Sequence, residues 1–313
     1  MIVVLTGGTG GAKFAQGLKR VLPARELLFV VNTGDDFRWW GLPVSPDLDS
    51  ITYALADLLS RDRGWGVEGD TFHCLEAMGR LGAPTWFRVG DRDLATHLLR
   101  GQLLAAGKTL SAATIEITRR LEIDARILPM TDARVETRIL TPEGELSFEE
   151  YFVRERYQVP VEGVRLKGIE TAQPAPGVLE AIETADVVLI APSNPITSIG
   201  PILAVPGIRK ALAETPAPVG AVSPIVGSRA VSGPAGALMQ LQGLPVSPEG
   251  VARFYADFLD VLIADERDAS ALRGVSVPGV RFHCTQTLMK SLDDKVQLAR
   301  AAVESTQQAQ VVG

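Results

Sequence analysis

The sequence has little that would mark a secreted, membrane-bound or nucleic-acid-binding protein. Its 313 residues include two cysteines, Cys74 and Cys284, so the chain can form one disulfide at most. No apolar run approaches the roughly 20 residues of a membrane span, and no charged segment of a signal peptide precedes the first apolar run. The net charge of −6 provides no positive field for nucleic acid. We therefore expect a cytoplasmic protein that binds small molecules and neither nucleic acid nor membrane.

An activated nucleophile is also missing from the sequence. The three histidines, His73, His97 and His283, stand at no triad or metal-ligand spacing, and neither do the two cysteines. We interpret the histidines as structural residues. Any chemistry should therefore be a direct transfer, in which positioning and neutralisation of charge provide most of the catalysis.

Short runs rich in Val, Ile and Leu alternate with helical patterns along most of the chain. Continuous apolar runs indicate strands buried on both faces, and their alternation with helices indicates βαβ units. We therefore predict an α/β fold with a Rossmann-like, mostly parallel sheet and helices on both faces. The predicted strands are 2–5, 27–31, 125–129, 187–191, 219–222, 261–264 and 280–284, and the predicted helices are 12–22, 178–184, 208–214, 249–259 and 292–305.

Two segments interrupt this alternation. Residues 50–121 contain helical patterns and no convincing strand, which predicts a helical insertion within an α/β core made of residues 1–49 and 122–313. Residues 135–169 contain a Pro-Glu-Gly-Glu turn between two short extended stretches. This second segment predicts a small antiparallel hairpin.

A glycine-rich turn, LTGGTGGAKF, follows the first apolar run. It departs from the dinucleotide-binding fingerprint, because Lys13 replaces the third glycine and Asn32 stands where an acidic residue would bind a ribose. It departs from the P-loop because Phe14, not Ser or Thr, follows the lysine. A helix N-terminus with one cation remains, and this combination binds phosphate. The candidate residues are Gly8, Thr9, Gly10, Gly11 and Lys13.

Two other predicted strands end in polar loops that contain glycine. PSNPITSIG follows strand 187–191, and SPIVGSRAVSGPAG follows strand 219–222. Because ligands bind at the carboxyl ends of parallel strands, the three loops predict one site for an extended phosphate compound. In the loop after 187–191 the candidate residues are Asn194, Ser198 and Gly200.

Four aspartates, Asp35, Asp36, Asp47 and Asp49, lie in one short stretch after the second predicted strand. Carboxylates repel phosphate, and a divalent cation such as Mg²⁺ between the two resolves this conflict. Asp47 suits the N-cap of the next helix, and Asp36 suits a structural or solvated charge. Asp35 and Asp49 are therefore the predicted metal ligands and catalytic carboxylates.

Two further features stand near these aspartates. The Trp39–Trp40 pair has two interpretations, because it can stack on a flat ligand ring or lie half in the core and half on the surface. Arg88 follows an extended apolar stretch and is a candidate to reach a ligand.

Over nearly its whole length the sequence resembles one known family, the 2-phospho-L-lactate transferases of coenzyme F420 biosynthesis. The resemblance is carried by LTGGTGGAKFAQGL, VVNTGDDFRWWGLPVSPDLDSITYAL, RGWGVEGDTF, WFRVGDRDLATHLLR, APSNPITSIGPIL, VSPIVGSRAVSGPA and TLMKSLDDKVQLA. It implies a Mg²⁺-dependent transferase of substituted phosphate groups. A phospholactyl or phosphoenolpyruvyl group passes from a guanosine diphosphate ester to the terminal ribityl hydroxyl of the deazaflavin Fo, and GMP leaves.

The resemblance also implies roles for individual residues and an oligomeric state. Asp49 and Arg88 match positions that contact Fo, and Asp35 and Asp49 match metal-binding carboxylates. The glycine turn and the loop 194–200 match the diphosphate and guanosine side. Members of the family are commonly homodimers.

One alternative comes from the wider superfamily, which includes YvcK-like proteins that bind nucleotide sugars. These proteins share the glycine turn but lack the WFRVGDRDLATH block. The alternative is therefore a nucleotide-sugar-binding regulator without transferase activity. A dehydrogenase is a weaker interpretation because Asn32 occupies the ribose-binding position.

Overall fold

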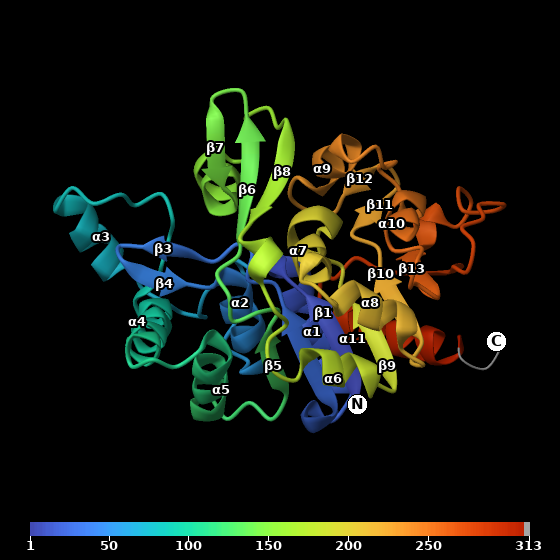
Figure 1. Ribbon diagram of the computed structural model, residues 1–313, viewed down its shortest axis with the longest axis horizontal. Helices are drawn as coiled ribbons and strands as arrows, with labels where there is room; N and C mark the ends of the chain where they lie inside the picture. The colour runs from blue at the N-terminus through green and yellow to red at the C-terminus, as the bar shows by residue number, and fades with distance from the viewer. Residues whose placement is uncertain (310–313) are drawn as a thin grey trace.

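A computed structural model of the chain describes residues 1–309. Its centre is a seven-stranded sheet with the order β14-β13-β10-β9-β1-β2-β5, in which every neighbouring pair is parallel. The predicted α/β fold is therefore confirmed, with each of the seven predicted strands in one sheet (Figure 1). The strands are β1 (Ile2–Thr6), β2 (Leu27–Val31), β5 (Arg126–Pro129), β9 (Val187–Ile190), β10 (Val219–Val222), β13 (Val261–Asp265) and β14 (Arg281–Thr285).

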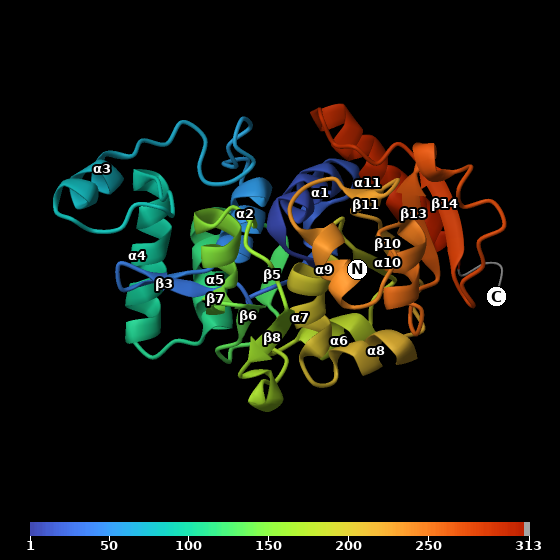
Figure 2. The ribbon, with the colours of Figure 1, turned by 90° about the horizontal axis from the view of Figure 1, so that it is seen from above.

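Helices cover both faces of this sheet. Figure 2 shows α1 (Gly8–Val21) and α11 (Leu292–Gln307) on one face, and α6 (Val178–Glu183), α7 (Gly200–Ala204) and α8 (Ile208–Glu214) on the other. Two more helices, α9 (Ala235–Leu241) and α10 (Pro248–Phe254), lie near β10 and β13. Within residues 1–309, no helix combines the length and the apolar character needed to span a membrane.

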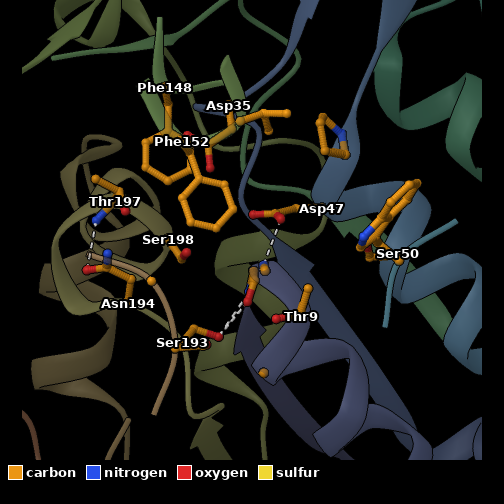
Figure 3. A pocket seen from close by; sticks show the side chains of 18 of the residues that line it. Thr9, Asp35, Asp47, Ser50, Phe148, Phe152, Ser193, Asn194, Thr197 and Ser198 are labelled. Carbon is orange, nitrogen blue, oxygen red and sulfur yellow. Dashed lines mark hydrogen bonds between the residues drawn. The ribbon is translucent and has the colours of Figure 1, made fainter. Parts of the chain in front are cut away.

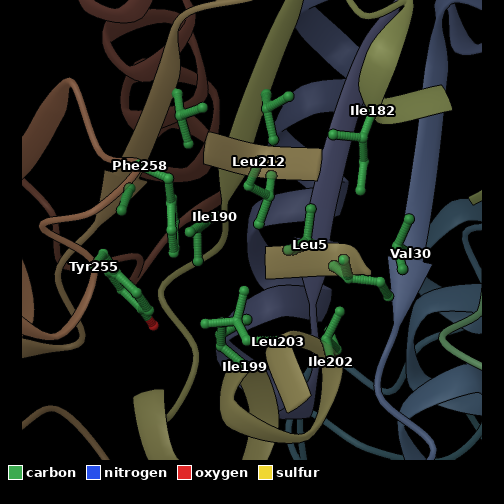
Figure 4. Packing of buried hydrophobic residues seen from close by; sticks show 14 of the residues in the cluster. Leu5, Val30, Ile182, Ile190, Ile199, Ile202, Leu203, Leu212, Tyr255 and Phe258 are labelled. Carbon is green, nitrogen blue, oxygen red and sulfur yellow. The ribbon is translucent and has the colours of Figure 1, made fainter. Parts of the chain in front are cut away.

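The sheet is buried because its strands are apolar on both sides. In β1, Val3 and Leu5 pack into one hydrophobic cluster while Ile2 and Val4 pack into another on the opposite face. Figure 4 shows the first cluster, in which Leu5 lies among side chains from the helices 178–214. This two-sided burial is why the strand sequences are continuous runs rather than alternating ones.

The strand order reverses direction between β1 and β9. The chain moves from β1 to β2 on one side and returns to β9 on the other, so the turns after β1 and β9 leave the sheet at the same point. In parallel sheets such a switch point opens a crevice at the carboxyl ends of the strands. The loops that carry the predicted phosphate-binding residues meet there.

The segment beyond β2 contains an unpredicted hairpin followed by helices. β3 (Phe37–Trp39) pairs with β4 (Leu42–Val44) through a turn in which Trp40 and Gly41 both have positive φ, the backbone of a tight two-residue hairpin. The helices are α2 (Pro46–Leu55), α3 (His73–Arg80), α4 (Asp91–Ala105) and α5 (Leu110–Arg120). The predicted boundary at residue 50 falls inside α2, which begins at Pro46 and packs on α1 of the core. The division into a core and an insertion 50–121 therefore stays a prediction.

A small antiparallel sheet stands above the carboxyl ends of the central strands (Figure 1). β6 (Glu136–Thr141) pairs with β7 (Gly144–Ser147), which confirms the predicted hairpin. A third strand, β8 (Gly163–Lys167), pairs with the other edge of β6 and was not predicted. The short helical segment η2 (Glu150–Arg154) connects β7 to β8, and it lies over the cavity described next.

Candidate active site

A cavity of about 650 Å³ lies at the switch point of the central sheet, within the usual size range of small-molecule sites. Its wall comes from the β1–α1 turn, α2, α4, the segment around η2, and the loops after β9, β10 and β14. Most of the predicted site residues meet in this one cavity although they are far apart in sequence. Those that line it are Gly8, Thr9, Gly10, Lys13, Asp35, Asp49, Arg88, Asn194 and Ser198.

The glycine turn is shaped by close packing as well as by its ligand-binding position. Gly8 has φ +66, a left-handed conformation that favours glycine, and its N–H donates to Asp47 Oδ1 over 2.7 Å. A Cβ at Gly10 would overlap the carbonyl oxygen of Pro192. In the first turn of α1, the amides of Thr9 and Gly10 have no intrahelical acceptor and face the cavity end of the helix.

Two predicted donor-site residues do not line the cavity. Gly11 lies deeper in α1, where its N–H bonds the Gly7 carbonyl by helical geometry and a Cβ would overlap Thr6 Oγ1. Gly200 begins α7 behind the loop that carries Asn194. Ligand contacts by Gly11 and Gly200 therefore stay predictions, and the absence of a Cβ at both positions allows close packing of the backbone.

The loop after β9 is fixed against the glycine turn. The hydroxyl of Ser193 donates to the Gly7 carbonyl over 2.7 Å. The Asn194 side chain accepts from Ile196 N at 3.0 Å and caps the following segment, η4 (Pro195–Ile199). Figure 3 shows Ser193 beside Thr9, and Ser198 and Asn194 on the same side of the pocket, with the Asn194 side chain turned toward Thr197. The two loops therefore form one polar rim around the N-terminus of α1.

Three carboxylates from different parts of the chain meet beside this rim: Asp35, Asp47 and Glu149, which we call the Asp35 group. All three are buried and line the cavity. Asn32 Nδ2 donates to Asp35 Oδ2 and to Asp47 Oδ2, both over 3.0 Å, and so holds the two aspartates together. Asn32 thus has a structural reason to replace the acidic residue of a dinucleotide-binding fold.

The Asp35 group carries more negative charge than its surroundings balance. Burial, and then the charges of Asp47 and Glu149, raise the pKa of Asp35 well above its usual range. Burial raises the pKa of Asp47 to about 6 and, together with nearby aspartates, that of Glu149 to about 8. Asp35 Oδ1 is buried without a hydrogen-bond partner, and no basic side chain among residues 1–309 forms an ion pair with the group. Hard oxygen ligands with no counter-charge fit a divalent cation.

Of two aspartates near this group, one differs from its sequence-based interpretation. Ser45, not Asp47, occupies the N-cap of α2, and the Asp47 carboxylate turns to Gly8 and Asn32 instead. Asp36 is a structural charge as expected, since it is half-buried and accepts from Ser45 Oγ over 2.7 Å rather than lying free in solvent. Asp47 and Glu149 are thus site residues that the sequence analysis missed.

Asp49 belongs to a second set of polar side chains between α2 and α4, which we call the α2–α4 ladder. It consists of Asp49 and Tyr53 on α2 and Asp93, His97 and Arg100 on α4. The Arg100 guanidinium bonds both oxygens of Asp49, and His97 Nδ1 lies 3.4 Å from Asp49 Oδ2. Tyr53 OH donates to Asp93 Oδ1 over 2.8 Å. Every member is buried, and all but Arg100 line the cavity.

Asp49 and Asp35 therefore lie in different charge environments. The Arg100 guanidinium already compensates Asp49, whereas no cation compensates Asp35. Asp49, Asp93 and His97 offer ligand atoms within 4.8 Å of one another and are a second candidate cation position. Burial, with the charge of Asp49, raises the pKa of Asp93 to about 7, and burial lowers the pKa of His97 to about 4. His97 is therefore neutral near pH 7.

Aromatic side chains form the remaining wall. Trp86 and Phe87 line the cavity on one side, and Phe148 and Phe152 stack on each other with ring centroids 5.5 Å apart on another. In Figure 3 these two phenylalanines lie over the space between Asp35 and Ser198. Trp39 is instead buried against Phe87, outside the cavity lining, so the interpretation of the tryptophan pair as half core is confirmed.

Three cations complete the lining: Lys13, Arg88 and Arg156. No carboxylate in the described part of the chain forms an ion pair with any of them. Arg88 is exposed, and its guanidinium lies 4.7 Å from the centroid of the Phe72 ring. These charges remain available to an anionic ligand.

Comparisons with known proteins identify the family and relatives of this chain. The family model described as 2-phospho-L-lactate transferase CofD matches residues 2–276. A 2-phospho-L-lactate transferase of Methanosarcina acetivorans is 45% identical over 96% of this chain and 98% of its own length. A phosphoenolpyruvate transferase of Streptomyces coelicolor is also 45% identical, over 96% of this chain and 97% of its own length.

Solved structures show the same fold at lower sequence identity. A UPF0052 family protein of Bacillus halodurans superposes with a TM-score of 0.64 over 96% of this chain and 99% of its own, at 19% identity. The family match covers residues 2–276, and the identity to the relatives extends over 96% of the chain. The chain belongs to the CofD family of 2-phospho-L-lactate transferases.

Proposed function

We propose that this chain transfers a phospho-three-carbon acid from a guanosine diphosphate ester to the terminal ribityl hydroxyl of the deazaflavin Fo. The observation that carries the proposal is one cavity with three chemically distinct walls, in a chain of this family. One wall presents helix amides and a lysine, one presents uncompensated carboxylates, and one is aromatic. They suit a diphosphate, a divalent cation and a flat ring system respectively.

The donor occupies the rim formed by the glycine turn and the loop after β9. The amides of Thr9 and Gly10 and the ammonium of Lys13 bind the diphosphate, since a helix N-terminus favours anions. Asn194 and Ser198 contact the guanosine side of the same ligand. The Gly8 amide supports the site indirectly, because its bond to Asp47 fixes that carboxylate beside the turn.

The acceptor occupies the end of the cavity near α2 and α4. Asp49 and Arg88 contact Fo there, and Trp86, Phe87, Phe148 and Phe152 supply flat apolar surface for its ring. Because Arg100 holds Asp49 by both oxygens, the Asp49 carboxylate has a fixed orientation toward the acceptor.

Mg²⁺ would be held by the Asp35 group, with Asp35 and its unpartnered Oδ1 as the principal ligand. When bound, the ion supplies positive charge that neutralises the diphosphate. Asp49, the second ligand expected from the resemblance, contributes to the acceptor instead, since Arg100 already bonds its oxygens. A divalent cation beside that guanidinium would meet positive charge.

The residues of the chain promote the reaction by positioning the two substrates and stabilising charge. The ribityl hydroxyl attacks the phosphorus that bears the acid and loses its proton to solvent. The bond from that phosphorus to the bridging oxygen breaks, so GMP leaves with that oxygen. Lys13 and the helix N-terminus stabilise the charge that develops on the leaving phosphate. No side chain forms a covalent intermediate. The homodimer and the cytoplasmic location expected from the sequence stay predictions.

The first test is turnover with a choice of donors. Purified protein incubated with Fo, Mg²⁺ and an equimolar mixture of lactyl and enolpyruvyl guanosine diphosphates should release GMP and form a phosphodiester of Fo. Mass spectrometry of the product identifies the preferred acid, since relatives are named for each of the two. Tight binding of a nucleotide sugar with no release of GMP would contradict the proposal and favour the regulator.

The stability of the metal-free protein should fall as pH rises, and added Mg²⁺ should reverse this fall. Asp47 and Glu149 have folded-state pKa values of about 6 and about 8, above the ordinary values of 3.8 and 4.5. Their contribution to stability is therefore present below about pH 4 and is lost as pH rises through 6 and 8. The melting temperature of metal-free protein should fall by several degrees between pH 5 and pH 8.

Added Mg²⁺ should restore the melting temperature at pH 8 and change little at pH 5, because protonated carboxyls do not bind the ion. Glu149→Gln is the control, since it removes the titration near pH 8 and should flatten the upper part of the profile. A metal-free profile that is flat from pH 5 to pH 8 would contradict the charge imbalance assigned to the Asp35 group.

A further inference from the structure

Asp93 is a buried carboxylate in the cavity that the reaction has not yet used. Only 7% of the residue is exposed, and it lines the cavity from the first turn of α4. Its Oδ1 accepts from Tyr53 OH over 2.8 Å, whereas no hydrogen bond within residues 1–309 engages its Oδ2. An acceptor oxygen without a protein partner at a cavity wall is available to a hydrogen-bond donor of a ligand.

Two other members of the α2–α4 ladder, Tyr53 and His97, lie close to one oxygen of this carboxylate, Oδ1. The Arg100 guanidinium can only donate, and its Nη1 donates to His97 Nδ1 over 3.3 Å. The proton of the neutral imidazole is therefore on Nε2, which faces Asp93 Oδ1 at 3.5 Å. Tyr53 donates to Oδ1, and His97 Nε2 faces the same oxygen without reaching hydrogen-bond geometry. Oδ2 is the oxygen left for a ligand.

The chemistry of the two substrates decides which of them Asp93 can accept. The donor is anionic at its phosphates and its acid, and a carboxylate without a cation repels it. The ribityl chain of Fo is neutral and carries several hydroxyl donors in a row. Asp49 and Asp93 place carboxylate oxygens within 4.8 Å of each other, so together they can accept from neighbouring hydroxyls of one chain.

A cation is the competing occupant of the same place, since Asp49, Asp93 and His97 could all be ligands. The Arg100 guanidinium argues against this, because it already neutralises Asp49 and donates to the imidazole nitrogen on that side. We propose that Asp93 is a further acceptor-binding residue, whose Oδ2 receives a hydrogen bond from the ribityl chain of Fo. This inference rests on the proposed function, because it assigns a new contact to the acceptor end of that site.

The test is equilibrium binding of Fo at pH 8.5, where the Asp93 carboxyl is ionised, without donor or Mg²⁺, to the wild type and to Asp93→Asn. Loss of a hydrogen bond to a charged group should weaken Fo binding about ten- to hundredfold. Binding of GDP, used as the probe of the donor side, should be unchanged. Asp91→Asn is the matched control, since Asp91 lies on the same helix, accepts from Thr71 and Cys74, and does not line the cavity.

A second ligand separates the ribityl chain from the ring. A deazaflavin with a methyl group in place of the ribityl chain should bind the wild type and Asp93→Asn equally. An equal loss for both ligands would overturn the assignment to the ribityl chain. An Asp93→Asn variant with normal Fo binding but a raised Mg²⁺ requirement would overturn the inference in favour of a metal site.

A measurement on the wild type covers the case in which Asp93→Asn fails to fold. Fo analogues that each lack one ribityl hydroxyl should include at least one internal position whose loss costs about tenfold or more in affinity. If no analogue loses affinity, the inference is wrong. These outcomes differ from failure of the proposed function, in which the wild type neither binds Fo nor releases GMP.

Discussion

Replacing Asp35 with asparagine should reduce kcat about thirty- to thousandfold and raise the Mg²⁺ concentration needed for half-maximal rate. The substitution keeps size and shape but removes one charge from the group that has no cation of its own. A metal ion that neutralises phosphate oxygens is worth several kcal/mol in the transition state, and 1.36 kcal/mol corresponds to a tenfold change in rate. Fo affinity should remain normal, because Asp35 belongs to the donor end of the cavity.

Two neighbouring aspartates make this experiment specific. Asp36→Asn is the matched control, since Asp36 is half-buried next to Asp35 in the chain but bonds Ser45 and does not line the cavity. Asp49→Asn should lower Fo affinity and leave the Mg²⁺ titration close to that of the wild type. If Asp35→Asn follows the wild-type Mg²⁺ curve while Asp49→Asn departs from it, the ion belongs to the α2–α4 ladder and our assignment of the two carboxylates is reversed.

The central sheet could be predicted from sequence because each strand carries its own signal. A strand buried on both faces needs apolar side chains at every position, and 27–31 and 219–222 agree with the structure to the residue. The start of α1 could not be predicted in this way. A run of glycines indicates a turn, yet here the helix already begins at Gly8, because small residues are required where it packs against Pro192 and Thr6.

The candidate site shows the same division between local and long-range information. The residues of the glycine turn and of the loop after β9 could be identified because each stands at the end of a predicted strand. Asp47 was misassigned because an aspartate at the start of a helix has the same pattern whether it caps the helix or faces a ligand. Glu149 gave no signal, since only the folding of the small antiparallel sheet over the cavity brings it to Asp35.

The pairing of Asp49 with Arg100 depends on residues that are 51 positions apart. A usable signal was present, because Asp93, His97 and Arg100 recur at spacings of four and three along α4 and therefore share one helix face. Three ionisable residues on one face would normally indicate a solvated surface. Their burial follows from the partner residues on α2, which the spacing along α4 does not reveal.

Replacing Arg100 with methionine should destabilise the fold by about 3–5 kcal/mol, because it leaves the buried Asp49 carboxylate without its counter-charge. Methionine replaces the apolar stem of the arginine side chain, so most of the change reflects loss of the guanidinium. The measurement is urea denaturation at neutral pH with the wild type alongside. Arg119→Met is the control, since Arg119 forms an exposed pair with Glu116 on α5, and such pairs contribute about 1 kcal/mol or less.

The double variant Asp49→Asn with Arg100→Met separates the structural role of the pair from its role in binding. Removing both charges should recover most of the lost stability, since no uncompensated charge remains in the interior. Fo binding should not recover, because the oriented carboxylate is gone. If Arg100→Met alone costs no more than Arg119→Met, then Asp49 reaches water or another cation, and Arg100 cannot be what holds this carboxylate in place for the acceptor.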